Sequence, residues 1–144
     1  MLRVITIWIM AFSLVACATQ NLGGTIKTSN QLVKEAKASI KEVSVDDVKK
    51  MIDNKEKIII LDVRDKEEFE TGYIPGAINL SRGLLEFKIN TIIPDKNSVI
   101  IVYCGIDLRG PLATRTLNES GYKNAVNIIG GLKAWKAAGY PVAK

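Results

Sequence analysis

The chain of 144 residues contains no histidine and only two cysteines, and these shortages exclude several kinds of active site. Without histidine it has no Cys-His pair, no Ser-His-Asp triad and no histidine-ligated metal. The two thiols, Cys17 and Cys104, cannot supply a four-thiolate zinc site. Their number would permit a disulfide, but the N-terminal context of Cys17 argues against one. Proton transfer must therefore use carboxylates, water or the backbone, and we expect no metal and no cofactor.

The chain also lacks a cluster of basic residues. It carries 20 Lys and Arg against 15 Asp and Glu, a net charge of +5, and the lysines are interspersed with acids, as at 34–37 and 66–68. Nucleic-acid binding requires clustered basic side chains, so we expect a solvated, mildly basic surface and no nucleic-acid partner. With 47% hydrophobic residues, the length suits one domain with an ordinary core plus an appendage.

The N-terminal segment has the pattern of an export signal. Arg3 precedes an apolar run over residues 4–16, which is too short to span a bilayer because about 20 residues are needed. The alternative is a buried helix or strand. The run ends in Leu-Val-Ala before Cys17, which resembles the lipobox of bacterial lipoproteins. That resemblance implies cleavage before Cys17 and acyl chains on its thiol and amine, which together form a firm membrane anchor.

The sequence therefore predicts three segments. Residues 1–16 form a signal peptide, residues 17–30 a lipidated N-terminus with a polar tether, and residues 31–144 the folded domain with a short N-terminal helical extension. The domain is expected on the periplasmic side of a bacterial membrane, without distinguishing the inner from the outer membrane.

From residue 31 the predicted strands and helices alternate. Continuous runs of β-branched residues within 57–63 and 98–103 predict central strands buried on both faces of a parallel sheet. Shorter strands are expected at 40–43, 77–80 and 125–129. Helices are expected at 31–39, 44–54, 66–71, 81–92 and 111–120, with a last helix carrying Leu132 and Trp135 inward. This order predicts a single α/β domain with a mostly parallel sheet.

Cys104 directly follows one of these buried strands and precedes a helix N-terminus. Functional sites in parallel α/β sheets form at the carboxyl ends of strands. The helix predicted from Pro111 would direct its positive end at Cys104, and Arg109 adds a cation; both favour a thiolate over a thiol. The alternative is that Cys104 is a small buried hydrophobic residue.

A set of motifs in chain order resembles rhodanese-like domains. They are LDVR at 61–64, EF at 68–69, GYIPGAIN at 72–79, VYC at 102–104 with Arg109, GY at 121–122, GG at 130–131, Trp135 and GYP at 139–141. The resemblance covers roughly residues 41–143. It implies a sheet of about five parallel strands flanked by helices on both faces.

The resemblance also implies a chemistry. A cysteine thiolate, here Cys104, takes a sulfane sulfur from thiosulfate or polysulfide, holds it as a persulfide and passes it to a thiophilic acceptor. A cup of backbone N–H groups stabilises the sulfur anion, and Arg109 also binds the anionic donor. Carried over, the cup residues are Gly105, Ile106, Asp107, Leu108, Arg109 and Gly110. The related dual-specificity phosphatases have one residue more between cysteine and arginine.

Within the family the chain resembles periplasmic polysulfide-sulfur transferases more closely. The shared features are an N-terminal helical extension and the segment SRGLLE at 81–86. A membrane respiratory sulfur enzyme is the candidate partner, as the recipient of sulfur that a carrier would deliver. Two alternatives stay open: a non-catalytic periplasmic sulfur carrier or binding module, and an inactive rhodanese scaffold for protein interaction. The intact Cys104 and Arg109 count against the scaffold.

Three further residues around the site carry expectations. Asp107 stands where the family often has glycine, and aspartate tolerates the left-handed backbone conformation, so the loop shape is kept. Its side chain is expected to point outward, because an inward, unpaired carboxylate beside a thiolate is costly and would repel thiosulfate. Asp62 and Arg64 are expected to form a structural ion pair with turn contacts, and the alternative is that they brace the active loop.

The lipobox resemblance generates a first prediction. Cells that express the full chain and are fed radioactive palmitate should label the wild-type protein at Cys17, and Cys17→Ser should carry no label. Label that persists in Cys17→Ser would contradict lipidation at this residue.

Overall fold

A computed structural model describes residues 26–144, so the predicted signal peptide and Cys17 lie outside the described residues. The described part contains one five-stranded sheet in the order β1-β5-β4-β2-β3, in which every pairing is parallel. The strands are β1 (Glu42–Val43), β2 (Ile59–Asp62), β3 (Ile78–Asn79), β4 (Ile100–Tyr103) and β5 (Ala125–Ile128). The predicted fold class, a single α/β domain with about five mostly parallel strands, is confirmed.

The first two helices begin at side-chain caps that the sequence supplies. The helices are α1 (Ser29–Ser39), α2 (Val45–Asp53), α3 (Lys66–Glu70), α4 (Leu85–Ile92) after a short 3₁₀ turn η1 (Arg82–Leu84), α5 (Arg109–Glu119) and α6 (Gly131–Ala137). Thr28 and Gln31 form a capping box at α1, and the Ser44 hydroxyl accepts the N–H of Asp47 at α2. α1 begins two residues before the predicted 31, and α5 begins at Arg109 instead of Pro111.

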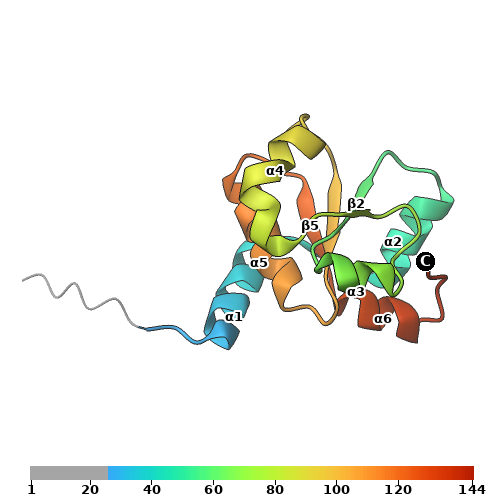
Figure 1. The fold of residues 1–144 in the computed structure, drawn as a ribbon, viewed down its shortest axis with the longest axis horizontal. Helices are drawn as coiled ribbons and strands as arrows, with labels where there is room; N and C mark the ends of the chain where they lie inside the picture. Colours follow the sequence, from blue (N-terminus) through green and yellow to red (C-terminus); the bar gives the residue numbers. More distant parts are fainter. Residues whose placement is uncertain (1–25) are drawn as a thin grey trace, which may run out of the picture.

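In Figure 1, α4 and α5 lie on one side of the sheet and α2 and α6 on the other. Two apolar cores lie between the sheet and these helices. One core joins β-strand residues with α4 and α5 through buried side chains such as Leu85 and Leu117. The other joins the sheet with α2 and α6 and contains the fully buried Trp135. α1 packs against α5, at the end of the domain from which the chain leaves toward its N-terminus (Figure 1). The sheet is therefore covered on both faces, as a parallel sheet requires.

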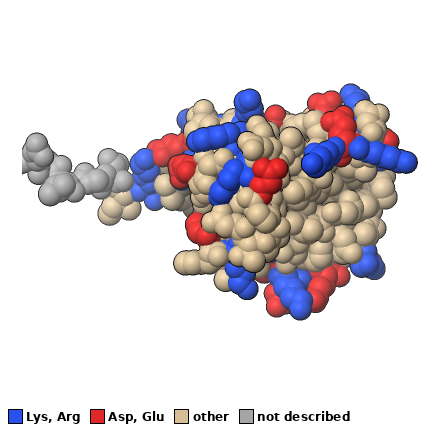
Figure 2. Space-filling model, turned by 90° about the horizontal axis from the view of Figure 1, so that it is seen from above, with Lys and Arg blue, Asp and Glu red and all other residues tan. Residues whose placement is uncertain are grey.

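The surface carries charges of both signs. On the face drawn in Figure 2, lysine and arginine side chains lie beside acidic ones and form no continuous basic patch.

Over residues 26–144, no helix has both the length and the apolar character that a membrane crossing needs.

Candidate active site

Cys104 lies at the carboxyl end of β4, the middle strand of the sheet. A loop over residues 104–108 connects β4 to α5. Cys104 is a free thiol and is 1% exposed, and it belongs to the core cluster beneath α4 and α5. Ile106 and Leu108, by contrast, are exposed on the outside of the loop. A reaction partner must therefore approach the cysteine sulfur past the loop backbone.

The loop is fixed by α6, which lies on the face of the sheet opposite to α4 and α5. The carbonyl of Cys104 accepts the N–H of Leu132 at 2.8 Å, and the carbonyl of Gly105 accepts the N–H of Lys133 at 3.0 Å. No peptide bond in residues 26–144 is cis. In a trans peptide the N–H points opposite to the carbonyl, so the N–H groups of Gly105 and Ile106 point away from α6, toward the face that holds Cys104.

These loop N–H groups are available to a ligand. Among residues 26–144, no acceptor is hydrogen-bonded to the N–H of Gly105, Ile106 or Asp107. α5 begins two residues after Asp107, at Arg109, and its first N–H groups have no partner within the helix. Consecutive free N–H groups next to a helix N-terminus form a concavity that favours an anion. The loop can thus stabilise a negative charge that forms on the sulfur of Cys104.

Gly131 allows α6 to approach the loop so closely. Its φ is +59°, in the left-handed region, and a Cβ at this position would collide with the carbonyl oxygen of Cys104. A glycine is therefore required where α6 begins. The hydrogen bonds from α6 that orient the loop depend on this close contact.

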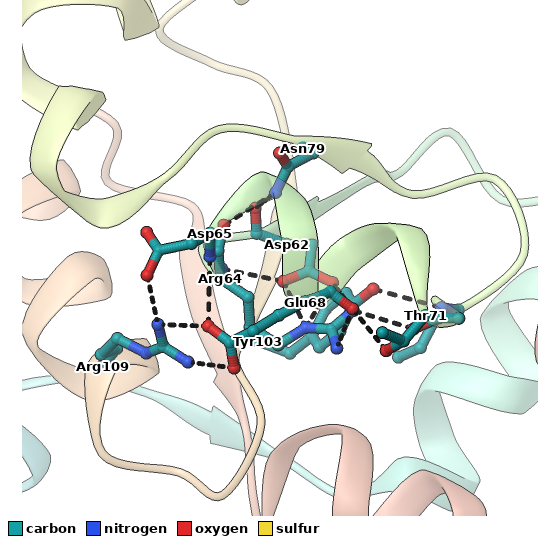
Figure 3. Close-up of polar contacts among 10 residues, drawn as sticks. Asp62, Arg64, Asp65, Glu68, Thr71, Asn79, Tyr103 and Arg109 are labelled. Carbon is teal, nitrogen blue, oxygen red and sulfur yellow. Dashed lines mark hydrogen bonds and ion pairs between the residues drawn. The ribbon is translucent and has the colours of Figure 1, made fainter. Parts of the chain in front are cut away.

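Arg109, at the end of the loop, is held by two acidic side chains (Figure 3). Its guanidinium lies 2.6 Å from Glu68 Oε2 and 3.3 Å from Asp65 Oδ2. The hydrogen bond that Arg109 donates to Glu68 is the main factor that raises the pKa of Arg109, and the charge of Cys104 adds to it. The same contact lowers the pKa of Glu68. Arg109 is thus a permanent cation within electrostatic range of Cys104, but much of its charge is already balanced.

Asp62 and Arg64 form a buried network beneath this cation (Figure 3). Asp62 is 0% and Arg64 4% exposed, and Arg64 Nη2 lies 2.6 Å from Asp62 Oδ2. Arg64 also donates to the carbonyls of Glu68 at 3.0 Å and Gly72 at 2.9 Å. The Asn79 amide donates to the carbonyls of Asp62 and Arg64. These contacts join β2, α3 and β3, and so set the position from which Glu68 reaches Arg109.

Asp107 does not point outward, so that expectation is wrong. Its residue exposure is 9%, and its carboxylate forms an ion pair with Lys37 of α1 and accepts the amide of Asn127 at 2.7 Å. The argument for an outward side chain assumed an unpaired carboxylate, whereas this one is paired with a cation. The backbone expectation was correct, because Asp107 has a φ of +67°.

Sequence reasoning missed the partners on both sides of the loop. Lys37, Glu68 and Asn127 belong to distant elements, and no local pattern links them to Cys104. It also missed a hollow of about 310 Å³ beside the loop, lined by Gly105, Ile106, Leu132, Lys133 and Lys136. Lys133 and Lys136 form no ion pair with an acidic side chain in residues 26–144.

Comparisons with known proteins agree with this geometry. The sequence model of the rhodanese-like domain matches residues 44–138. YrkF of Bacillus subtilis (strain 168), provisionally named a sulfur carrier protein, is 34% identical over 101 residues, which are 70% of this chain and 54% of YrkF. The chain thus spans about half of that relative. YtwF of the same organism, provisionally named a sulfurtransferase, is 35% identical over 102 residues, 71% of this chain and 96% of YtwF.

A solved structure from Rhodopseudomonas palustris CGA009 has a similar fold. It superposes with a TM-score of 0.76 at 32% identity, and the alignment covers 83% of this chain and 98% of that one. That protein is described as having unknown function and as a possible tyrosine phosphatase.

The close contact between α6 and the loop generates a prediction. Gly131→Ala should lower the free energy of unfolding by at least about 2 kcal/mol, because it adds both a strained backbone angle and a collision with the Cys104 carbonyl. Urea denaturation measures the change. Gly83→Ala is the matched control, because Gly83 has open space around it and no positive φ, and it should stay within about 0.5 kcal/mol of the wild type. Equal losses in the two variants would contradict the role of the contact.

Proposed function

The chain belongs to the rhodanese-like domain family, and we propose that it transfers sulfane sulfur from thiosulfate or polysulfide to a thiophilic acceptor through a persulfide on Cys104. The observation that carries the proposal is the set of free loop N–H groups on the side of the loop that faces Cys104. Names of relatives such as YtwF support sulfur transfer in general, and the donor and the persulfide are our inference.

The reaction balances without a proton-transfer residue. The Cys104 thiolate attacks the outer sulfur of thiosulfate, a new S–S bond forms, the S–S bond of thiosulfate breaks, and sulfite leaves with its electron pair. An acceptor such as cyanide then takes the outer sulfur of the persulfide as thiocyanate, and the thiolate is restored. With polysulfide, the donor chain is shortened by one sulfur. Neither step needs a general base, which agrees with a chain that has no histidine.

The loop supplies what these steps need. Negative charge lies on the cysteine sulfur before the first step and on the outer sulfur after it. N–H groups that are fixed before the reaction stabilise such charge without reorganisation. The N–H groups of residues 105–107, the N-terminus of α5 and the Arg109 guanidinium provide this positive potential. The near-complete burial of Cys104 keeps bulk water away from the persulfide.

The cations around the loop favour a sulfur donor that carries negative charge. Arg109 contributes a charge shared with Glu68 and Asp65, whereas Lys133 and Lys136 line the hollow beside Gly105 without an acidic partner in the described residues. These two lysines add positive potential beside the loop, which can attract a donor dianion to this part of the surface. Phosphatase activity is disfavoured, because four residues separate Cys104 from Arg109, one fewer than in the related phosphatases.

A non-catalytic carrier is the second candidate function. The provisional name of YrkF, a sulfur carrier protein, favours it. Enzyme and carrier would load the same persulfide, and they differ in whether the sulfur leaves rapidly to a small acceptor. Turnover in the presence of excess acceptor therefore separates the two.

The location of the domain is proposed from the sequence. The apolar run that ends at Cys17 supports export and lipid anchoring, so the domain would work at the periplasmic surface of a membrane. A membrane respiratory sulfur enzyme is the proposed partner.

Steady-state thiocyanate formation from cyanide tests the proposal, with thiosulfate and polysulfide as alternative donors. The full chain should carry Cys17→Ser, so that Cys104 is its single thiol. Cys104→Ser should abolish turnover. Arg109→Ala should lower kcat/KM about tenfold or more, because a hydrogen bond to a charged group contributes about 1.5–3 kcal/mol.

Arg115→Ala is the matched control for Arg109. Arg115 lies on the same helix and pairs at 3.9 Å with Glu119 instead of an active-site group, so its removal should leave turnover unchanged. Full activity in Cys104→Ser would contradict the proposed function. Loading of Cys104 without turnover would favour the carrier.

A further inference from the structure

The buried carboxylate of Asp107 connects the active loop to a part of the chain outside the matched family segment. Its partner Lys37 lies on α1, which ends before residue 44, where the family match begins. Lys37 lies 70 residues from Asp107 in the sequence, and their contact joins the N-terminal helix directly to the loop that follows Cys104.

Four side chains form this network. The Asn127 amide Nδ2 donates to Asp107 Oδ1 at 2.7 Å and to Glu42 Oε1 at 2.8 Å. Lys37 Nζ contacts Asp107 Oδ2 and lies 3.6 Å from Glu42 Oε1. Two carboxylates thus share one amide donor and one ammonium group. The Asp107 side chain is 10% exposed, so it depends on these partners more than on water.

The network contacts the loop at two points. One is Asp107 itself, whose left-handed backbone conformation sets the direction of the neighbouring peptide planes. The other is Gly110, where the Asn127 Oδ1 atom occupies the space that a Cβ would need. Asn127 is fully buried on β5, and its Oδ1 has no hydrogen-bond partner in residues 26–144. A movement of Asn127 or Asp107 would therefore disturb both the last of the free N–H groups, at Asp107, and the first turn of α5, at Gly110.

Removal of the ammonium group would unbalance this arrangement. Asp107 and Glu42 would remain as two neighbouring carboxylates on a single amide, and a carboxylate that loses its only cation is strongly destabilised when buried. The cheapest response is for Asp107 to turn toward water, which changes its backbone angles. The peptide planes on either side of Asp107 would then turn, and with them the N–H groups next to Cys104. The contact with Asp107 also raises the pKa of Lys37, so this cation keeps its charge.

We propose that Lys37 is a positioning residue for the active loop, which through Asp107 and Asn127 holds the N–H groups that stabilise the sulfur anion on Cys104. The proposal rests on the proposed sulfur transfer. Under this proposal α1 contributes a residue to the site, although the helix lies outside the family match. Lys37 itself does not touch the donor, so its loss should lower kcat more than it raises the KM for the donor.

A double-mutant cycle tests the coupling, in the full chain that carries Cys17→Ser. Lys37→Met leaves an unpaired buried carboxylate and should lower kcat about tenfold, which corresponds to about 1.4 kcal/mol in activation free energy. Asp107→Asn keeps a residue that tolerates positive φ and should cost less, because Lys37 retains Glu42. The double variant Lys37→Met/Asp107→Asn has no unpaired charge at Asp107 and should recover to within about threefold of the wild type.

Two further variants on α1 separate positioning from a general effect of charge. Lys34→Met removes a cation from an exposed site on the same helix and should leave kcat unchanged. Lys37→Arg keeps the charge and should retain most of the activity. If Lys37→Met does not fold, the coupling between Lys37 and Asp107 is measured through stability instead of activity. The double variant should then recover the ability to fold.

The outcomes are distinct. No turnover and no sulfur on Cys104 in the wild type would mean that the proposed function fails. Normal wild-type turnover, with a folded Lys37→Met variant that is equally active, would overturn the positioning role alone. A double variant that is no better than Lys37→Met, in activity or in folding, would also overturn it.

Discussion

The structure depends on the hydrogen bonds by which α6 holds the carbonyls of Cys104 and Gly105. A peptide plane has two ends, and fixing its carbonyl on one side of the sheet fixes its N–H on the other. The positive lining around Cys104 is thus built from the backbone and does not require a particular side chain at 105 or 106. This explains why the exposed Ile106 can occupy the loop without disturbing its chemistry. It also explains why a glycine, Gly131, is needed where α6 meets the loop.

Charges around the loop are balanced in pairs, so the net field at Cys104 is set by a few groups. Glu68 and Asp65 hold Arg109 in place, and Lys37 neutralises Asp107 on the other side. The proposed reaction suits a chain without histidine, because sulfur transfer between sulfur atoms moves an electron pair and no proton. In that proposal the protein would hold an anion, first a thiolate and then a persulfide, at a cysteine that is nearly closed to water.

The sequence predicted the features that depend on neighbours in the chain. The buried strands over 59–62 and 100–103 follow from their β-branched runs, and the start of α2 follows from the cap at Ser44. Cys104 was placed at a strand end by the same local reasoning. The start of α5 was missed because a proline is accepted throughout the first helical turn, and Pro111 is the third residue of the helix, not its first.

The side-chain partners could not be predicted in the same way. The orientation of Asp107 depends on Lys37, 70 residues earlier, and the state of Arg109 depends on Glu68, 41 residues earlier. Such pairs become visible only when the sheet order β1-β5-β4-β2-β3 brings α1 and α3 to the same loop. The hollow beside Lys133 and Lys136 arises in the same way, from the docking of α6 on the loop.

Mass spectrometry of the peptide that contains Cys104, after brief exposure of the protein to thiosulfate or polysulfide, tests the central claim most directly. The account predicts a mass increase of one sulfur atom on that peptide, which cyanide or a thiol reductant removes. The increase should be smaller in Gly131→Ala, in which the loop N–H groups are displaced. A Cys104 peptide that gains no sulfur from either donor, in a protein that is otherwise folded, would contradict the claim that this loop stabilises a persulfide.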